Sequence, residues 1–161
     1  MQLIIYFGTY GSTEEAAKKL AVELEASVLD GSKRHKVNIN DYERVVFGYN
    51  IHAAKPNKSF IKYYKKFHRL YPNMPVAAFI VAADNNRKGE YLIQAEKLLP
   101  AGSRLAFVGG RLDSTHAKGL SKVIINNCLK AFISNDLELP KLDEEKLKDF
   151  AQELKEKEPQ F

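Results

Sequence analysis

The segment with the clearest chemical potential is the hydroxyl- and glycine-containing run Gly8-Thr9-Tyr10-Gly11-Ser12-Thr13. It follows a short apolar run and precedes apolar residues at helical spacing, which predicts a strand, a tight loop and a helix. Backbone N–H groups converge at such a helix start, where the helix dipole favours an anion. The run has no lysine, so it is not the loop that grips a triphosphate. Its hydroxyls suit a single phosphate monoester; the alternative is a capping box with no ligand, made by Ser12 and Glu15.

Polar and aromatic residues also follow three other predicted strands. Tyr49, Asn50, Ile51 and His52 come after the apolar run 45–48, Asp84 and Asn85 come after 76–81, and Arg111 and Asp113 come after 105–108. In parallel sheets covered by helices, ligands bind outside the carboxyl ends of the strands. These residues are therefore candidate ligand contacts, although polar residues at such places are often only turn formers. Arg111 has two interpretations: an ion pair with Asp113, or a contact with a substrate carboxylate.

The order of the apolar segments predicts an α/β protein. Strand-like apolar runs alternate with segments of helical spacing, which favours a parallel sheet with helices on both faces. We expect a single three-layer domain over residues 1–161 with a five-stranded parallel sheet. The last predicted helix, 143–156, is amphipathic, begins at the N-cap Asp143 and packs on this domain. The apolar segment 120–132 predicts a largely buried helix, with Cys128 in the core.

Composition excludes several classes of protein. Of the 161 residues, 45% are hydrophobic and 28% are charged, unlike disordered or collagen-like chains. No apolar run approaches the roughly 20 residues that span a membrane, and the first residues lack the features of a secretory signal. The one cysteine and four histidines make neither an internal disulfide nor a metal-binding pattern. We expect a cytoplasmic protein without a bound metal.

Charge is distributed unevenly along the chain. Residues 1–134 carry a net charge of +9, and residues 135–161 carry −4. No acidic residue lies between Glu43 and Asp84. The predicted helix within that gap carries five basic residues: Lys58, Lys62, Lys65, Lys66 and Arg69. Such a face attracts anionic partners, and the alternative is an ordinary solvated helix face. Our hypothesis is that this helix docks on the anionic inner face of a membrane or on an acidic redox partner. No nucleic-acid motif is present.

The first loop resembles the phosphate loop of flavodoxins, which commonly reads S/T-x-T-G-N-T. Gly11 and Thr13 match this pattern directly, and Ser12 stands where the family has asparagine. Gly8 and Tyr10 replace the family's other hydroxyl residues. The resemblance implies a flavodoxin-like fold with bound FMN.

The resemblance extends over nearly the whole chain. Residues 41–52 resemble the family's strand, glycine and aromatic loop, and residues 82–86 lie where flavodoxins carry their second flavin-contacting loop. More narrowly, residues 107–113 and the terminal segment 143–154 resemble the flavodoxin domain of menaquinone-dependent protoporphyrinogen dehydrogenases. The order and spacing of these motifs carry more weight than any one of them.

The resemblance also implies roles for the candidate residues. The loop 8–13, with Thr9 among its hydroxyls, would hold the FMN phosphate. In the loop 49–52, which includes Ile51, Tyr49 would stack on the flavin ring, with His52 and Tyr10 as the next candidates. Asn50 would meet the N5 edge of the flavin. Asp84 and Asn85 would meet its pyrimidine edge or the ribityl chain, and Arg111 and Asp113 would form the substrate rim.

Three functions remain open at this point. The first is an FMN oxidoreductase that passes electrons from an organic substrate, with protoporphyrinogen as a candidate, to a quinone. The second is an electron carrier between protein partners. The third is an interaction module without a cofactor. In the first two, the flavin performs the chemistry and the protein positions it and tunes its potential.

Overall fold

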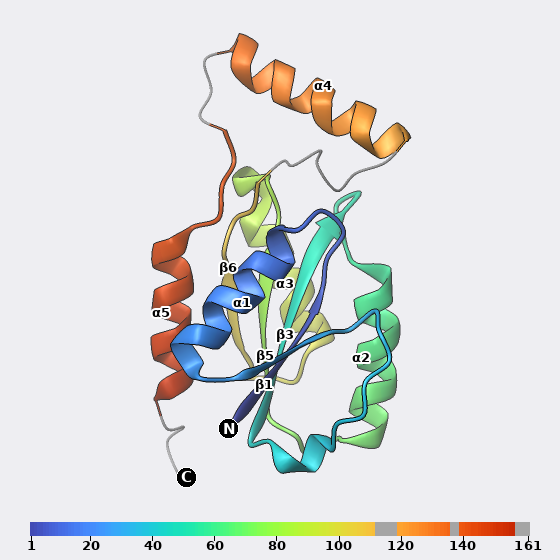
Figure 1. Cartoon of the computed structure of the whole chain (residues 1–161), viewed down its shortest axis with the longest axis vertical. Helices are drawn as coiled ribbons and strands as arrows, with labels where there is room; N and C mark the ends of the chain where they lie inside the picture. Colours follow the sequence, from blue (N-terminus) through green and yellow to red (C-terminus); the bar gives the residue numbers. More distant parts are fainter. Residues whose placement is uncertain (112–118, 136–138, 157–161) are drawn as a thin grey trace.

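The computed structural model describes residues 1–111, 119–135 and 139–156 (Figure 1). Its centre is a parallel sheet made of β1 (Gln2–Phe7), β2 (Ser27–Asp30), β3 (Arg44–His52), β5 (Val76–Val81) and β6 (Arg104–Phe107). The strand order is β2-β1-β3-β5-β6. The two-residue strand β4 (Lys55–Pro56) pairs antiparallel with the end of β3. The five predicted parallel strands are therefore confirmed, and β4 is an addition.

Helices cover both faces of the sheet (Figure 1). The covering helices are α1 (Ser12–Leu24), α2 (Lys58–Leu70), α3 (Lys88–Leu98) and α5 (Glu144–Lys155). Helix α4 (Leu120–Ser134) lies outside these layers, and short 3₁₀ helices occur at Ile39–Asp41 and Asn85–Arg87. Side chains of α1 and α5 share one apolar core with the sheet, and those of α2 and α3 share the other. The expected α/β architecture, with helices in two outer layers, is confirmed.

Alternation along β3 sends successive side chains into opposite layers. Val45, Phe47 and Tyr49 belong to the core beneath α2 and α3, whereas Val46 belongs to the core beneath α1 and α5. This period of two is a property of extended backbone. This alternation decides which residues at the end of β3 can reach a ligand.

The final helix follows its prediction closely. The Asp143 side chain accepts a hydrogen bond from the backbone N–H of Lys146 and so caps α5. The apolar face of α5 is buried, with Leu147 and Phe150 almost fully enclosed. At the other end, the Leu154 carbonyl accepts hydrogen bonds from the buried side chains of Gln2 and Arg44.

The prediction of a largely buried helix at 120–132 is wrong. Helix α4 stands above the carboxyl edge of the sheet (Figure 1), and Leu120, Val123 and Ile124 are all more exposed than buried. Cys128, expected in the core, is also exposed. Apolar residues at helical spacing predict a helix with an apolar face, but they do not say whether the tertiary structure covers that face.

Candidate functional site

The candidate site lies where the strand order reverses its direction. Starting from β1, the chain adds β2 on one side and β3 on the other, and such a switch point leaves a crevice at the carboxyl ends of the two strands. The loop 8–11 after β1 and the hairpin after β3 meet at this place. A hydrogen bond from the Asn50 side chain to the Thr9 hydroxyl, 3.0 Å long, joins them.

Helix α1 begins without a side-chain cap. Its N-cap residue is Gly11, whose φ of 94° lies in the left-handed region that glycine adopts at little cost. The predicted N-cap, Ser12, is instead the first helical residue, so the proposed capping box does not form. Glycine offers no acceptor to the first-turn N–H groups, which leaves them to be satisfied by solvent or by an anion.

Gly8 permits a close approach inside the same loop. A Cβ atom at Gly8 would lie 2.7 Å from the Cβ of Thr13, a distance that forces one of the two to move. Thr13 is buried beneath the loop, whereas Thr9 is exposed on its outer side. Tyr10 is half-buried. Of the predicted phosphate contacts, Thr9 is therefore an exposed residue that a ligand can reach, whereas Thr13 is buried.

Asn50 orients the Thr9 hydroxyl. Its Oδ1 accepts a hydrogen bond of 2.8 Å from the Asn57 side chain, which fixes the direction of the amide. Its Nδ2 then donates to the Thr9 Oγ1. Because Thr9 accepts this bond, its own O–H proton is left to donate outward, toward an anion in the loop. Asn50 thus acts on the site through Thr9 and is itself buried, with 7% of its surface exposed.

The expectation that Tyr49 stacks on a ligand is wrong. Its ring is fully buried and stacks on Phe60 of α2, with ring centroids 4.2 Å apart. The physical reason is that β3 continues through His52, so Tyr49 is still a strand residue and points into the core shared with α2 and α3. Burial also raises the pKa of the Tyr49 hydroxyl.

Ile51 and His52 belong to a tight hairpin beside the loop. They pair with Pro56 and Lys55 of β4 across a two-residue turn formed by Ala53–Ala54. Ile51 is half-buried, and His52 is exposed. The Gln94 side chain of α3 donates a 3.0 Å hydrogen bond to the Ala54 carbonyl and ties the hairpin to that helix. Of the predicted aromatic contacts, His52 is therefore the exposed one at the end of β3.

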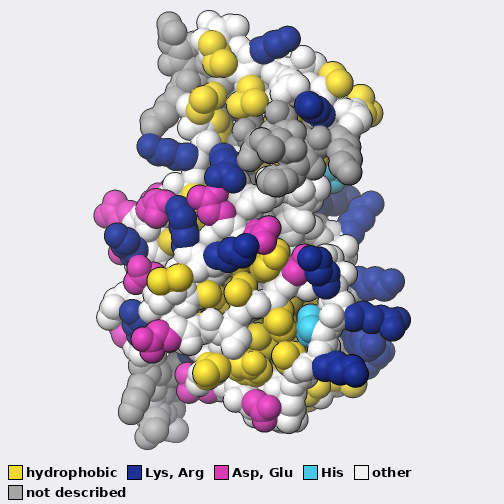
Figure 2. All heavy atoms as spheres, viewed as in Figure 1, with side chains coloured by type: hydrophobic (Ala, Val, Ile, Leu, Met, Phe, Trp, Pro, Cys, Tyr) yellow, Lys and Arg dark blue, Asp and Glu magenta, His cyan; other side chains and the backbone are white. Residues whose placement is uncertain are grey.

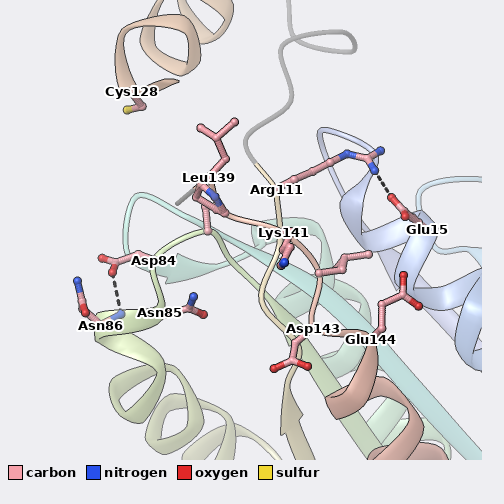
Figure 3. Close-up of a pocket in the computed structure, with 13 residues that line it drawn as sticks. Glu15, Asp84, Asn85, Asn86, Arg111, Cys128, Leu139, Lys141, Asp143 and Glu144 are labelled. Carbon is pink, nitrogen blue, oxygen red and sulfur yellow. Dashed lines mark hydrogen bonds and ion pairs between the residues drawn. The ribbon is translucent and has the colours of Figure 1, made fainter. Parts of the chain in front are cut away.

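The other predicted contacts lie around a cavity of about 1080 Å³ at the carboxyl edge (Figure 3). Asp84 and Asn85, which follow β5, and Arg111, which follows β6, all line it. The Asp84 carboxylate accepts a hydrogen bond from the Asn86 backbone, so it also closes a turn. The prediction missed Cys128 of α4 and the segment Leu139–Glu144, which complete the wall. No local sequence signal marks these residues, because only the return of the chain to β6 brings them here.

The chain returns to the sheet beside its point of departure. Gly109 pairs with Leu142 in an antiparallel bridge, and the Gly110 N–H donates to the Lys141 carbonyl. Gly110 and Lys141, one before and one after α4 in the sequence, are therefore joined at the carboxyl end of β6. Helix α4 contributes Cys128 to the cavity.

Arg111 connects this cavity to the start of α1. Its backbone N–H donates to the Ser12 hydroxyl at 3.1 Å, and its guanidinium pairs with the Glu15 carboxylate (Figure 3). The Ser12 hydroxyl is thus engaged by the loop after β6. Nearby, a hydrogen bond to Glu144 raises the pKa of Lys19, which also contacts Glu15. Asp113, the predicted partner of Arg111, lies outside the described residues.

The five basic residues of α2 form one exposed stripe. Lys62, Lys65, Lys66 and Arg69 follow Lys58 by four, seven, eight and eleven residues, a spacing that places all five on the same helix face. All five are exposed, and none makes an ion pair within the described parts of the chain. Dark blue side chains follow the right-hand edge of Figure 2, where α2 lies in Figure 1. We call this face the α2 stripe.

Residues 3–134 match the family model of the flavodoxin domain. The chain belongs to the flavodoxin domain family. No curated protein sequence matches it significantly. Among solved structures, this flavodoxin-domain protein is similar to a flavoprotein in complex with FMN from Lactobacillus acidophilus, with 19% identity and a TM-score of 0.50, over 66% of this chain and 89% of that one.

Two solved flavodoxins also resemble this flavodoxin domain. Oxidised flavodoxin 1 from Bacillus cereus is 15% identical, with a TM-score of 0.47, over 86% of this chain and 100% of that one. A flavodoxin from the domain Archaea is 13% identical, with a TM-score of 0.49, over 96% and 99%. At these identities the structural likeness concerns the fold.

Proposed function

We propose that this flavodoxin domain binds FMN and transfers electrons through it. The observation that carries the proposal is the loop 8–11, where an uncapped helix start, Gly11 and an outward-donating Thr9 hydroxyl are brought together at the switch point. These groups suit a phosphate monoester, which needs several N–H and O–H donors. The family match and the FMN complex of the Lactobacillus acidophilus relative support this cofactor.

In this proposal the loop holds the phosphate, and the flavin extends between the β3–β4 hairpin and the loop after β5. His52 and Tyr10 offer aromatic surface, and Asp84 and Asn85 offer polar contacts. Bound FMN would supply the one- and two-electron chemistry, and the chain's own residues would bind it and exclude water. Arg111, already tied to the loop through Ser12, would stand at the rim of the adjacent cavity.

The first test is the absorption spectrum of the protein with FMN, together with a titration of affinity. We expect shifted flavin bands and quenched fluorescence. Thr9→Ala should weaken FMN binding by roughly tenfold or more, because it removes a hydrogen bond to a charged group. Ser103→Ala removes a hydroxyl at the opposite edge of the sheet and should leave the affinity unchanged. Unshifted FMN with the wild-type chain would leave the cofactor-free interaction module as the function.

As to the reaction, we propose an oxidoreductase that passes electrons from an organic substrate to a quinone, with protoporphyrinogen as a candidate substrate. The cavity of about 1080 Å³ beside the loop gives room for a substrate, which a carrier between proteins does not need. Substrate-dependent reduction of a soluble quinone by the FMN-loaded protein is the expected result. Accumulation of one-electron reduced flavin, without turnover, would instead favour the electron carrier.

A further inference from the structure

Helix α4 leaves an apolar face uncovered. Leu120 is 75% exposed, and Val123 and Ile124 are each 54% exposed. On α1, by comparison, Val22 is the one large hydrophobic residue that is exposed, and a single exposed apolar residue is ordinary. In α4 the three residues stand at i, i+3 and i+4, so they share one face, and the exposed Ala131 lies on the same side. Yellow side chains gather over this helix at the top of Figure 2.

The charges around this face have one sign. Residues 114–134 contain three lysines and no acidic residue. Two of these lysines, Lys122 and Lys130, lie in α4 itself, and both are exposed. Neither makes an ion pair with any residue that the structure describes. Lys130 follows Val123 by seven residues, two helical turns, and so borders the apolar face, whereas Lys122 lies roughly 160° from Leu120 and Ile124, on the opposite side. An apolar face bordered by an unpaired lysine, on a helix without acidic residues, is complementary to a surface that is apolar below and anionic above.

We propose that α4 lies flat on an anionic lipid surface, with Leu120, Val123 and Ile124 at the level of the headgroups and acyl chains. The helix has 15 residues and is about 22 Å long, shorter than the roughly 30 Å hydrocarbon core of a bilayer. No helix in the described part of the chain is long and apolar enough to cross a membrane. The Lys130 stem can follow the apolar surface while its ammonium group reaches the lipid phosphates.

A second copy of the chain fits this face less well. Two α4 helices meeting through it would bring a Lys130 side chain from each copy to the edge of the contact, with no acidic side chain in either helix to neutralise them. An anionic bilayer supplies that neutralisation. It also orients the molecule, because Cys128 on the same helix lines the cavity at the carboxyl edge (Figure 3). Docking would place this cavity close to the membrane surface.

The test uses the absence of tryptophan from the chain. Ile124→Trp places a single tryptophan on the proposed contact face, and Val22→Trp places one at a position of α1 that is even more exposed. With vesicles of phosphatidylcholine and phosphatidylglycerol, we expect a blue shift for Ile124→Trp and none for Val22→Trp. Pure phosphatidylcholine should give a much smaller shift. The proposal does not depend on FMN, so the experiment is made with and without it.

Cosedimentation with the same vesicles gives the second measurement. Replacing both Leu120 and Ile124 by Glu should reduce binding at least tenfold, whereas Val22→Glu should not. Lys130→Gln should reduce binding by about fivefold, and Lys122→Gln, on the opposite side of the helix, should reduce it less. Circular dichroism checks that each variant stays folded, as expected for exposed positions.

Three results would overturn the proposal. The first is an unchanged Ile124→Trp spectrum with both kinds of vesicle. The second is equal binding to neutral and anionic vesicles, which would remove the role of the lysines. The third is a blue shift without lipid that grows with protein concentration and accompanies a dimer in gel filtration. That result would show that a second copy covers the face.

Discussion

Asn50 and Tyr49 are neighbours in β3 but serve opposite sides of the sheet. The Tyr49 ring lies in the core against Phe60, and the Asn50 amide lies in the hydrogen-bonded chain from Asn57 to Thr9. Because side chains alternate along a strand, Tyr49 is a core residue, whereas Asn50, one position later, positions Thr9 of the candidate loop.

This chain of hydrogen bonds makes a prediction about Asn50. Asn50→Asp replaces the amide donor by a carboxylate, to which the Thr9 hydroxyl would donate its proton instead of donating it to a phosphate. It also sets a negative charge beside the loop. We expect a larger loss of FMN affinity for Asn50→Asp than for Asn50→Ala, by roughly tenfold. Fluorescence titration checks the order; equal affinities would show that Asn50 does not orient Thr9.

The buried Tyr49 hydroxyl makes a prediction about stability. Among the residues that the structure describes, this hydroxyl has no hydrogen-bond partner, and an unsatisfied buried hydroxyl costs free energy. Tyr49→Phe should raise the free energy of unfolding by about 1 kcal/mol at neutral pH. Thermal and chemical denaturation measure this change, and a lower stability would indicate a partner such as an enclosed water.

Alkaline pH should reduce the same stability. Burial raises the pKa of Tyr49, and burial with the nearby Asp30 and Glu14 carboxylates raises the pKa of Tyr6 to about 12. Above pH of about 10, tyrosines ionise in the unfolded chain while these two stay protonated in the fold, so unfolding is increasingly favoured. Below that pH both states keep the proton and there is no effect. Denaturation between pH 9 and 12 should show a smaller alkaline loss for Tyr49→Phe than for the wild type.

At the scale of elements, the turn of the hairpin between β3 and β4 has a strained backbone. Ala53 and Ala54 both have positive φ, 50° and 61°, across a two-residue connection. This is the geometry of a type I′ turn, which usually takes Asn-Gly or Gly-Gly. Alanine pays a steric cost there, and contacts such as the bond from Gln94 to the Ala54 carbonyl maintain the turn. The hairpin positions His52 beside the candidate loop.

Glycine in this turn should therefore stabilise the protein. An alanine in the left-handed region destabilises the fold by about 1–2 kcal/mol, and glycine removes this strain. Glycine also raises the conformational entropy of the unfolded chain, which offsets part of the stabilisation. We expect Ala54→Gly to raise the free energy of unfolding by roughly 0.5–1 kcal/mol. Ala101→Gly, at an exposed position without a positive φ, should lower it. If both variants lose stability equally, the turn is not strained.

At the scale of the whole molecule, charge is divided between faces. The α2 stripe is cationic and unpaired within the described residues, whereas the last helix is rich in acidic residues, one of which reaches Lys19 of α1. The positive electrostatic potential near α2 is therefore higher than an even distribution of the net charge of +5 would produce. Such a field acts over about 8 Å at physiological ionic strength.

The α2 stripe should strengthen association with anionic vesicles. Replacing Lys62, Lys65 and Lys66 by Gln should weaken vesicle binding several-fold at low salt, and the difference should vanish near 1 M salt, where screening acts over about 3 Å. The matched control replaces Lys146, Lys148 and Lys155 of α5, which carry the same charge on another face. An equal loss in both triple variants would mean that net charge, and not the stripe, is responsible.

The sequence by itself determined the fold class and most elements. Buried apolar strands, glycines after them and helical spacing are local signals, and the five parallel strands and α5 with its Asp143 cap follow from them. The loop 8–13 could be found in the same way, because a phosphate site at a helix start is built almost entirely from adjacent residues. The N-cap residue of α1 could not be predicted in this way, since the Ser12 hydroxyl is hydrogen-bonded to Arg111, which is 99 positions away.

Tertiary structure alone decided which side chains reach the site. The direction of Tyr49 depends on how far β3 extends, and that depends on its pairing with β4, β1 and β5. The exposure of α4 and the wall of the cavity depend on where the chain returns to β6. Local propensity cannot express these contacts, because they join segments far apart in the sequence and their free energy exists only once the layers have packed.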